Sequence, residues 1–291
     1  MDFDGLRIFC AVASELSITA AATRLGRVPS NVTTRIQQLE MDLGSDLFVR
    51  TGKRISLSVA GERFHEYAQR MLALEGEARH VVTGGRDGGT LRIGSMDTTA
   101  ASRLPSILAR YHAAHPATRL ELRTGPSRPL IEHVRTGKLD CALVALPPSF
   151  GSPATLSELG LSARVIWSEK LQLLLPASEA GARRAVDVRT RSLAAFPQGC
   201  TYRTLAEDLL GTAGSTEWMV QEMASFHAMI ACVAAGACVT LLPESALRLS
   251  EAPAGLKKLP AGKSDTLLVW REGYDVPAFR QLLTLLPEAA K

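Results

Sequence analysis

The stretch that decides the fold of the first part of the chain is AAATRLGRVPSNVTTRIQQLE, residues 20–40. Two runs of helix-forming residues flank a break, GRVPSN, that contains both a glycine and a proline. Ser17 is placed to cap a short helix that ends at Gly26, and Ser30 to cap a further helix from Asn31 to about Leu43. The break therefore predicts a tight turn between two helices.

The residues before this stretch complete the motif. Residues 3–14 carry apolar side chains at helical spacing and predict a first amphipathic helix. In the third helix the predicted buried face is Val32, Ile36 and Leu39. Three short helices with a tight break between the second and the third form a helix-turn-helix pattern.

The first turn of the third helix has the side chains that a DNA groove accepts. A major groove is about 12 Å wide and admits a helix end with short, hydrogen-bonding side chains. A small surface helix with polar caps is the alternative interpretation of the same stretch. If this helix binds DNA, the residues predicted to contact bases are Ser30, Asn31, Thr33 and Thr34, and the residue predicted to contact a phosphate is Arg35.

A basic hairpin follows. LGSDLFVRTGKRISLSVAGERF, residues 43–64, has a Gly-Lys turn between two short extended runs, 47–50 and 55–57. Residues 24–54 hold six cations against three anions, a local excess of the kind that a DNA footprint has. The hairpin predicts a β-wing that contacts phosphates or the minor groove through Arg50, Lys53 and Arg54.

Residues 58–81 predict a long helix with an apolar stripe, which consists of Phe64, Tyr67, Ala68, Met71, Leu72, Leu74 and Ala78. A long solitary helix needs a partner for such a stripe. A second copy of the chain is one candidate, because dimers match two-fold operators, and packing against its own domain is the other. The next stretch, TGGRDGG at 83–89, predicts a flexible hinge and a domain boundary.

After the hinge, strands and helices alternate. TLRIGSM, RLELRTG and DCALVAL predict strands, separated by helices at about 101–114 and 127–138, which is a parallel βαβαβ unit. A second such parallel unit is predicted to begin near Leu161, with strands KLQLLLP, AAFP, EWMVQEM and CVTLLP and helices at about 201–211 and 226–235. The strand DTLLVWRE and a helix at 277–286 return to the first unit. Two α/β lobes joined by two crossovers enclose a cleft, where small ligands bind.

Polar residues follow the predicted strands at this cleft. Exposed N–H groups at a strand-to-helix turn form a seat for anions, and an arginine such as Arg203 could clamp a carboxylate bidentately. Asp97 favours an amine or a hydrogen-bond donor, unless it only caps its helix and faces water. The candidate ligand residues are Ser95, Asp97, Thr98, Thr99, Ser127, Gly199, Cys200, Thr201, Tyr202, Arg203, Glu222 and Ser225.

Composition narrows the class of protein. Apolar residues make up 46% of the chain and charged residues 21%, and the net charge is +4. The sequence has no apolar run of about eighteen residues and no secretory signal, so we expect a cytoplasmic protein without a membrane span. Its five cysteines lack the spacing of a metal site or a disulfide framework. We expect no cofactor, no metal and no catalytic residues, because the sequence has no dinucleotide-binding, nucleophile-elbow, Walker or zinc-protease motif.

The motifs resemble the LysR-type transcriptional regulators over the whole chain. The resemblance rests on ITAAATRLGRVPSNVTTRIQQLE, LGSDLFVRTGKRISLSVAGE, TLRIGSMDTTAASRLPSIL, GCTYR and ACVAAGACVTLLPESAL. Many members begin the recognition helix with Ser-Gln-Ser/Pro-Ala-Val-Ser, whereas this chain has Val28-Pro29-Ser30-Asn31-Val32-Thr33-Thr34, a difference that bears on the target sequence. The VPSNVTTRI helix together with GCTYR is similar to the branch that includes a putrescine-utilisation regulator.

The resemblance implies an α/β protein with a winged, all-α N-terminal domain. It implies a winged helix-turn-helix at 1–58, a linker and dimerisation helix with its hinge at 59–89, and a two-lobed effector domain at 90–291 that is built like a periplasmic binding protein. Lobe I would take about 90–162 and 267–291, and lobe II about 163–266. The implied partners are double-stranded promoter DNA, a small-molecule effector, a second copy in a dimer or tetramer, and RNA polymerase.

Two other functions compete with a DNA-binding regulator. The first is an α/β enzyme with a helical oligomerisation segment, which would need one of the catalytic motifs that the sequence lacks. The second is a nucleoid protein without ligand sensing, which leaves the two-lobed domain unexplained. The sequence therefore favours a regulator in which a ligand binds one arrangement of the lobes more tightly than another.

Overall fold

A computed structural model of the 291-residue chain describes residues 1–52, 54–82, 89–212, 214–250 and 255–287. Lys53 of the predicted wing and residues 83–88 of the predicted hinge lie outside these ranges. The chain divides into two compact units, the first of which consists mainly of Met1–Val82. Among the described residues, no helix combines the length and the apolar character that a membrane span needs.

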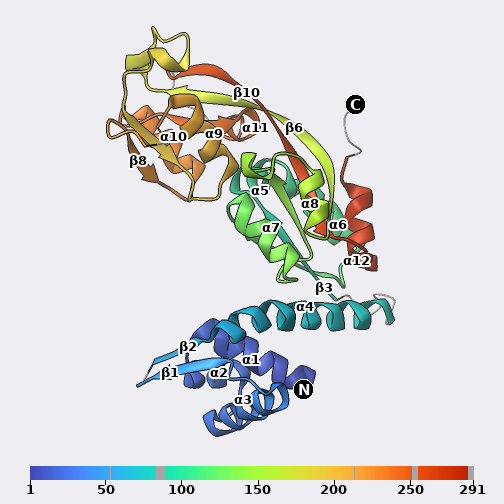
Figure 1. The fold of residues 1–291 in the computed structure, drawn as a ribbon. Helices are drawn as coiled ribbons and strands as arrows, with labels where there is room; N and C mark the ends of the chain where they lie inside the picture. The colour runs from blue at the N-terminus through green and yellow to red at the C-terminus, as the bar shows by residue number, and fades with distance from the viewer. Residues whose placement is uncertain (53, 83–88, 213, 251–254, 288–291) are drawn as a thin grey trace. The chain divides into compact units, whose positions relative to one another are not determined.

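The N-terminal unit begins with three helices, α1 (Phe3–Glu15), α2 (Ile18–Leu25) and α3 (Pro29–Leu43) (Figure 1). The Ser17 hydroxyl accepts a hydrogen bond from the Ala20 N–H at 3.2 Å. Gly26 ends α2 with a φ of 64°, a left-handed conformation that glycine adopts without the strain of a Cβ atom. The predicted start and end of the second helix are therefore confirmed.

Helix α3 begins two residues before its predicted start. Pro29 is the first helical residue, and Val28 is the N-cap without a side-chain hydrogen bond. Proline suits this position because its φ is already helical and the first helical N–H has no partner inside the helix. The prediction that Ser30 caps α3 is therefore wrong, because Ser30 lies inside the first turn. The predicted buried face is confirmed: Val32, Ile36 and Leu39.

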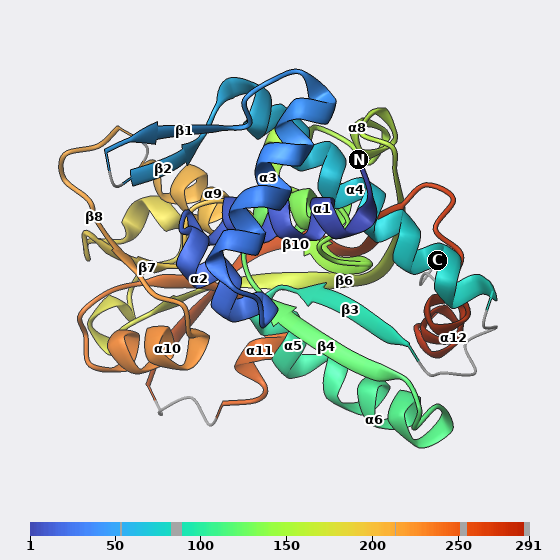
Figure 2. The same cartoon turned by 90° about the horizontal axis from the view of Figure 1, so that it is seen from below.

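The wing is a short antiparallel hairpin of β1 (Phe48–Thr51) and β2 (Arg54–Leu57), whose strands lie side by side in Figure 2. The Glu40 carboxylate accepts hydrogen bonds from the N–H groups of Leu47 at 2.8 Å and Phe48 at 3.1 Å, which ties α3 to the wing. A Cβ atom on Gly61 would lie 1.9 Å from the Leu47 carbonyl oxygen. Only glycine therefore lets the following helix pass this close to the wing.

That helix, α4 (Val59–Val82), divides its apolar stripe between two environments. One side packs on the core of the N-terminal unit through Phe64, Ala68, Met71 and Leu72. The centre of the Phe64 ring lies 5.1 Å from the centre of the Phe9 ring on α1. Tyr67 and Leu74 on the other side are 62% and 65% exposed. Packing against its own unit therefore accounts for only part of the stripe.

The second unit contains a six-stranded sheet of order β4-β3-β5-β10-β6-β9 (Figure 1). Strand β3 (Thr90–Ser95) pairs in parallel with β4 (Arg119–Thr124) and with β5 (Cys141–Ala145). Helices α6 (Leu104–Ala114) and α7 (Ser127–Arg135) connect these strands. The predicted parallel βαβαβ unit is confirmed.

The helix predicted at about 101–114 is two helices, α5 (Asp97–Ser102) and α6. Pro105 lies in the first turn of α6, where its missing N–H costs no hydrogen bond. Because Pro105 has no backbone N–H, it could not donate to the carbonyl of the residue four positions earlier. Helix α5 therefore cannot continue through Pro105.

Two long antiparallel strands, β6 (Leu161–Leu175) and β10 (Lys257–Arg271), run through both lobes and connect them. Two crossovers were predicted, but the prediction that KLQLLLP belongs to a second parallel unit is wrong, because this segment is the last part of β6 and pairs antiparallel with β10. At one end β10 pairs with β5, and at the other end β6 pairs with β9 (Thr240–Pro243). The pairing of the two long strands is irregular between Pro260 and Lys263. A proline inside a strand is accommodated at such an irregularity. The strand predicted at DTLLVWRE is therefore only the last part of β10.

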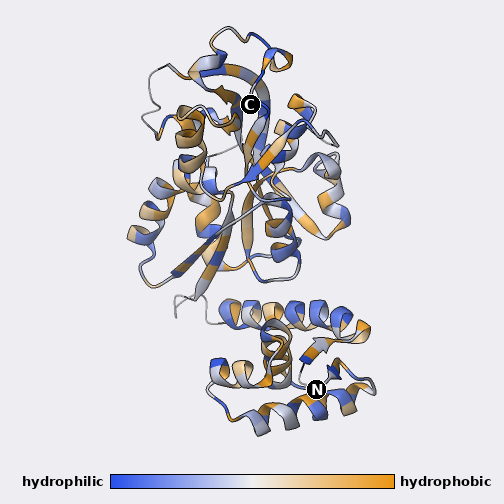
Figure 3. Cartoon of the chain, turned by 90° about the vertical axis from the view of Figure 1, so that its left-hand side faces the viewer, coloured by the Kyte–Doolittle hydropathy of each residue, from blue (hydrophilic) through white to orange (hydrophobic). Residues whose placement is uncertain are grey.

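The remaining elements complete two lobes. Lobe I contains β3, β4 and β5 with α5, α6, α7, α8 (Ala154–Glu158) and α12 (Pro277–Leu285). Lobe II contains β7 (Ser192–Ala195), β8 (Met219–Glu222) and β9 with α9 (Thr201–Leu210), α10 (Phe226–Ala234) and α11 (Glu244–Leu247). Each lobe has buried apolar clusters of its own, and hydrophobic residues, orange in Figure 3, alternate with hydrophilic ones along the strands and helices.

An ion pair between a partly exposed arginine and a buried carboxylate joins lobe I to a crossover strand. Arg103, at the corner between α5 and α6, donates to the Glu169 carboxylate on β6 at 2.7 and 2.8 Å. The Glu169 side chain is 5% exposed, and the Arg103 guanidinium lies 5.8 Å from the centre of the Trp167 ring. The charge of Glu169 is therefore matched inside the unit.

Candidate functional site

The first turns of α3 present the predicted polar side chains to solvent. Ser30, Asn31 and Thr34 are exposed, and Thr33 is partly buried. The Thr33 hydroxyl donates to the Pro29 carbonyl at 3.0 Å, which leaves its methyl group to make outside contacts. These side chains can donate and accept hydrogen bonds at the edges of base pairs.

The two arginines of this region are bound by carboxylates from the start of α1. Arg35 donates to both Asp2 oxygens at 2.7 Å and lies 3.4 Å from Asp4. Arg27 donates to the two Asp4 oxygens at 2.7 and 3.0 Å and to the Asn31 side-chain oxygen at 3.4 Å. The guanidinium of Arg35, which was predicted to contact a phosphate, is therefore engaged within the protein.

The wing places its described arginines on opposite faces. Arg50 pairs with Ile55 across the hairpin, and Thr51 pairs with Arg54. Since successive residues of a strand point to opposite faces, Arg50 lies on the face of Phe48, and Arg54 lies on the other face. Both side chains are exposed, so each is open to a phosphate but from a different side of the wing.

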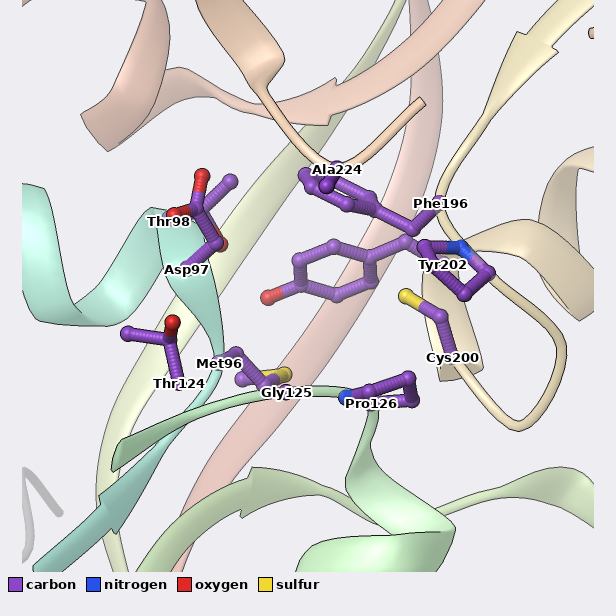
Figure 4. A pocket seen from close by; sticks show the side chains of 11 residues that line it. Met96, Asp97, Thr98, Thr124, Gly125, Pro126, Phe196, Cys200, Tyr202 and Ala224 are labelled. Carbon is purple, nitrogen blue, oxygen red and sulfur yellow. The ribbon is translucent and has the colours of Figure 1, made fainter. Parts of the chain in front are cut away.

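The second site is a cavity of about 220 Å³ between the two lobes (Figure 4). Lobe I contributes the turns after β3 and β4, and lobe II contributes the turns after β7 and β8. The residues that line it are Met96, Asp97, Thr98, Thr124, Gly125, Pro126, Phe196, Pro197, Cys200, Tyr202 and Ala224. Four of the predicted ligand residues, Asp97, Thr98, Cys200 and Tyr202, are thus brought together.

Asp97 supplies the carboxylate of this cavity. Burial raises the pKa of Asp97 above its ordinary value, and a hydrogen bond from the Phe226 backbone N–H partly offsets this effect. Phe226 is the first residue of α10, so the carboxylate of lobe I lies at a helix N-terminus of lobe II. Asp97 therefore lines the cavity, as a ligand residue would, and it also contacts the opposite lobe, which neither predicted alternative included.

Aromatic and sulfur-bearing side chains form the lobe II wall. The buried Tyr202 ring occupies the centre of the view in Figure 4, beside Phe196, and its hydroxyl points toward the Asp97 side. Cys200 is the N-cap residue of α9, and burial raises its pKa although the N–H groups of Arg203 and Tyr202 lower it in part. The thiol is therefore protonated at neutral pH, which disfavours a redox role.

Several predicted ligand residues hold the walls of the cavity rather than line it. The Ser95 hydroxyl donates to the Met96 carbonyl at 3.0 Å, and the Thr201 hydroxyl donates to the Ala145 carbonyl at 2.7 Å. Gly199 has a φ of 86°, and its carbonyl accepts the Arg128 N–H at 3.1 Å. Thr201 and Gly199 thus connect lobe II to β5 and α7 of lobe I.

The other predicted ligand residues lie in different surroundings. Arg203 donates to Glu207 at 2.8 Å and to Glu222 at 2.9 Å, and it does not line the cavity. Ser225 is the N-cap residue of α10 without a side-chain hydrogen bond. Thr99 and Ser127 are buried in lobe I. The predicted clamp of Arg203 on a ligand carboxylate therefore has no support in the geometry.

Sequence reasoning missed the apolar part of the lining, and at the turn after β4 it selected Ser127 instead of the residues that line the cavity. Phe196 and Pro197 follow β7, and Thr124, Gly125 and Pro126 follow or end β4. The rule that ligands bind at the carboxyl ends of strands would have found them, had it been applied to apolar side chains as well as polar ones.

Comparisons with known proteins agree on one family for both units. A family model described as "Bacterial regulatory helix-turn-helix protein, lysR family" matches residues 3–62. A second, described as "LysR substrate binding domain", matches residues 84–291.

Curated relatives and solved structures extend this match over the whole chain. The regulator YofA of Bacillus subtilis is 33% identical over 294 aligned residues, covering 99% of each chain, and the uncharacterized regulator YusT of the same organism is 34% identical, covering 89% of this chain and 85% of its own. The fold is similar to that of a full-length OxyR variant from Pseudomonas aeruginosa, with a TM-score of 0.70, 22% identity and coverage of 98% and 93%. It is also similar to CbnR, a LysR family regulator, with a TM-score of 0.66, 24% identity and full coverage of both chains.

Proposed function

This chain belongs to the LysR family of DNA-binding transcriptional regulators with an effector-binding domain, and from that premise we propose how it reads DNA and which class of effector it senses. The exposed first turns of α3 enter a major groove. Ser30, Asn31, Thr33 and Thr34 contact base edges there, and Arg50 and Arg54, together with Lys53, contact phosphates. The observation that carries this proposal is the exposure of short, neutral polar side chains at the start of α3.

Binding to the DNA upstream of the protein's own gene tests this assignment. In a gel-shift assay, Thr34→Ala is expected to weaken binding to that DNA about tenfold, the effect of losing one base contact, and to leave binding to random duplex unchanged. Ser14→Ala, which removes an exposed hydroxyl from α1, serves as the matched control. Equal binding by Thr34→Ala and the wild type would remove α3 from the base-reading role.

The effector proposed for the cavity is a small molecule with a primary amine. The lining includes one carboxylate, Asp97, together with the aromatic rings of Phe196 and Tyr202, and its described members include no lysine, arginine or histidine. A carboxylate and aromatic faces favour a cation, whereas an anionic effector would lie beside Asp97 without a cationic partner. An amine also agrees with the resemblance to putrescine-utilisation regulators.

A thermal-shift screen separates the two effector classes. Ligands that bind only the folded state raise the melting temperature as their concentration rises. We expect aliphatic mono- and diamines such as putrescine to give this rise, and dicarboxylates of similar length to give none. A rise with dicarboxylates alone would contradict the proposed class.

Self-association through α4 completes the proposed assembly. The exposed Tyr67, Leu74 and Val81 recur every seventh residue, so they share one face of the helix. A second copy of the chain would cover this face in a dimer, or in a tetramer of two dimers, on promoter DNA in the cytoplasm. Leu74→Glu is expected to lower the mass measured by light scattering, and Leu74→Met to leave it unchanged. An unaltered mass in Leu74→Glu would exclude this face.

The effector acts, in this proposal, by changing the balance between lobe arrangements. An amine that binds Asp97 competes with the α10 N-terminus for the same carboxylate. It therefore stabilises an arrangement in which this contact is loosened, and only this difference in affinity can shift the equilibrium. The altered arrangement changes promoter binding or the recruitment of RNA polymerase.

A further inference from the structure

The acidic start of α1 neutralises the two arginines closest to the reading surface. Asp4 holds Arg27 through both of its oxygens and lies 3.4 Å from Arg35, and both oxygens of Asp2 accept from Arg35. The four side chains therefore form a connected cluster with no net charge. The residues come from segments more than twenty positions apart, so the cluster exists only in the folded domain.

These side chains remain within reach of a ligand. Arg27 and Asp4 are 36% and 39% exposed, and Arg35 is 31% exposed. Arg27 also donates to Asn31, one of the residues proposed to read bases. The cluster therefore adjoins the proposed DNA surface instead of lying in the core.

A cluster without net charge affects binding to random-sequence DNA differently from binding to a specific DNA site. Random binding depends almost entirely on cations that displace counterions from phosphates. A phosphate that approaches Arg27 must compete with a bidentate carboxylate, so the gain from that contact is small. Hydrogen bonds from neutral side chains to base edges do not depend on this competition.

We propose that Asp2 and Asp4 are specificity-determining residues of DNA recognition, because they withhold Arg27 and Arg35 from the phosphates of arbitrary sequences. The recognition helix then depends on its neutral side chains, and the ratio of specific to random affinity rises. This inference rests on the proposed placement of α3 against DNA.

Asp4 is the better residue to test. Asp2 also caps α1, since its carboxylate accepts the Gly5 N–H at 2.7 Å, so its loss affects folding as well. Asp4 has its side-chain contacts with the two arginines. Asp4→Asn keeps the shape of the side chain and removes its charge.

The test measures the affinity of the full-length protein for a random-sequence duplex and for the DNA upstream of its own gene, across a range of salt concentrations. Asp4→Asn is expected to bind random duplex about two- to fivefold more tightly, the range that an exposed ion pair is worth. Its salt dependence should steepen by about 0.9 for one additional phosphate contact. Affinity for the upstream DNA should rise less, so the specificity ratio falls.

Two further variants separate this mechanism from a simple change in net charge. Asp275→Asn removes the same charge, but its partner is Arg280 on α12 of the effector-binding unit, so binding to random-sequence DNA should stay close to that of the wild type. Arg27→Gln in the Asp4→Asn background should abolish the gain, and Arg27→Gln alone should leave the salt dependence unchanged.

Three outcomes would overturn the inference. The first is unchanged binding to random-sequence DNA in a folded Asp4→Asn variant, and the second is an equal gain in Asp275→Asn. The third is a joint loss of melting temperature and of both DNA affinities, which would make the cluster purely structural. If Asp4→Asn fails to fold, Asp2→Asn, whose amide oxygen still caps α1, gives the same measurement. The effect of Thr34→Ala tests the DNA placement separately, so failure of one proposal is distinguishable from failure of the other.

Discussion

Two aspartates at helix starts, Asp2 before α1 and Asp97 at the beginning of α5, have opposite electrostatic surroundings. A hydrogen bond from the Gly5 N–H and another from Arg35 lower the pKa of Asp2. Burial raises the pKa of Asp97, and the Phe226 backbone N–H and the nearby His227 offset this only in part. The comparison teaches that the carboxylates at the start of α1 are paired with arginines of their own unit, whereas the carboxylate in the cavity can still be paired with an incoming cation.

The largest expected effect comes from breaking a charge match that is buried. Arg103→Gln leaves the buried Glu169 carboxylate without its cation, and an uncompensated buried charge costs about 3 kcal/mol of unfolding free energy. Urea denaturation measures this loss. Glu244→Gln breaks the exposed pair with Arg248 and should cost less than about 0.5 kcal/mol. Equal losses in the two variants would show that burial does not distinguish these pairs.

The next effect concerns the unmatched carboxylate. Asp97→Asn should weaken the binding of an amine effector by about 10- to 100-fold, because a hydrogen bond to a charged group contributes about 1.5–3 kcal/mol. Isothermal titration calorimetry measures the affinity, and Asp208→Asn, an exposed position on α9, is the matched control. An unchanged amine affinity in Asp97→Asn would place the effector elsewhere.

The pH dependence of stability should have opposite signs at the two aspartates. The folded-state pKa of Asp97 is raised above 3.8, so the folded state binds more protons in the interval above that value, and stability falls as pH rises through it. The folded-state pKa of Asp2 is lowered, so its contribution is present above 3.8 and is lost as pH falls through the folded-state pKa. Melting temperatures of Asp97→Asn and Asp2→Asn against pH should therefore differ from the wild type in opposite directions at neutral pH. Differences of the same sign would contradict the contrast.

The smallest effect concerns the wing cations. Arg50→Ala should weaken specific and random DNA binding about equally, by roughly threefold, and should lower the salt dependence by about 0.9. Arg54→Ala, on the opposite face of the wing, should show the same change only if both faces reach phosphates. Titrations at several salt concentrations measure both variants. An unchanged salt dependence in Arg50→Ala would remove its phosphate role.

Local patterns predicted most helices and strands because their causes lie within a few residues. The cap at Ser17 and the stop at Gly26 involve neighbours in sequence. The ion pair of Arg35 with Asp2 joins residues 33 positions apart, and no local pattern indicates it. The first part of β10 was not predicted for the same reason. Pro260 and Gly262 are typical of a loop, and this segment is a strand only because it pairs with β6, which is distant in sequence.

The candidate sites were predictable to a similar degree. Polar residues after strands led to Asp97, Thr98, Cys200 and Tyr202, because strand ends meet at one edge of a sheet. Whether a side chain lines the cavity or holds its wall depends on its rotamer and on partners such as Ala145 for Thr201. Those partners come from the other lobe and are set by tertiary packing.

The long pairing of β6 with β10 limits the ways in which the lobes can rearrange. Two separate tethers would let the lobes slide and rotate freely, but these strands are hydrogen-bonded to each other at both ends of the crossing. A pair of hydrogen-bonded strands can bend perpendicular to the plane of its hydrogen bonds, but its strands cannot slide past each other without breaking those bonds. A bound effector that rearranges the lobes must therefore bend this pair of strands. The bend should be concentrated where the pairing is irregular, beside Pro260 and between Thr266 and Leu267.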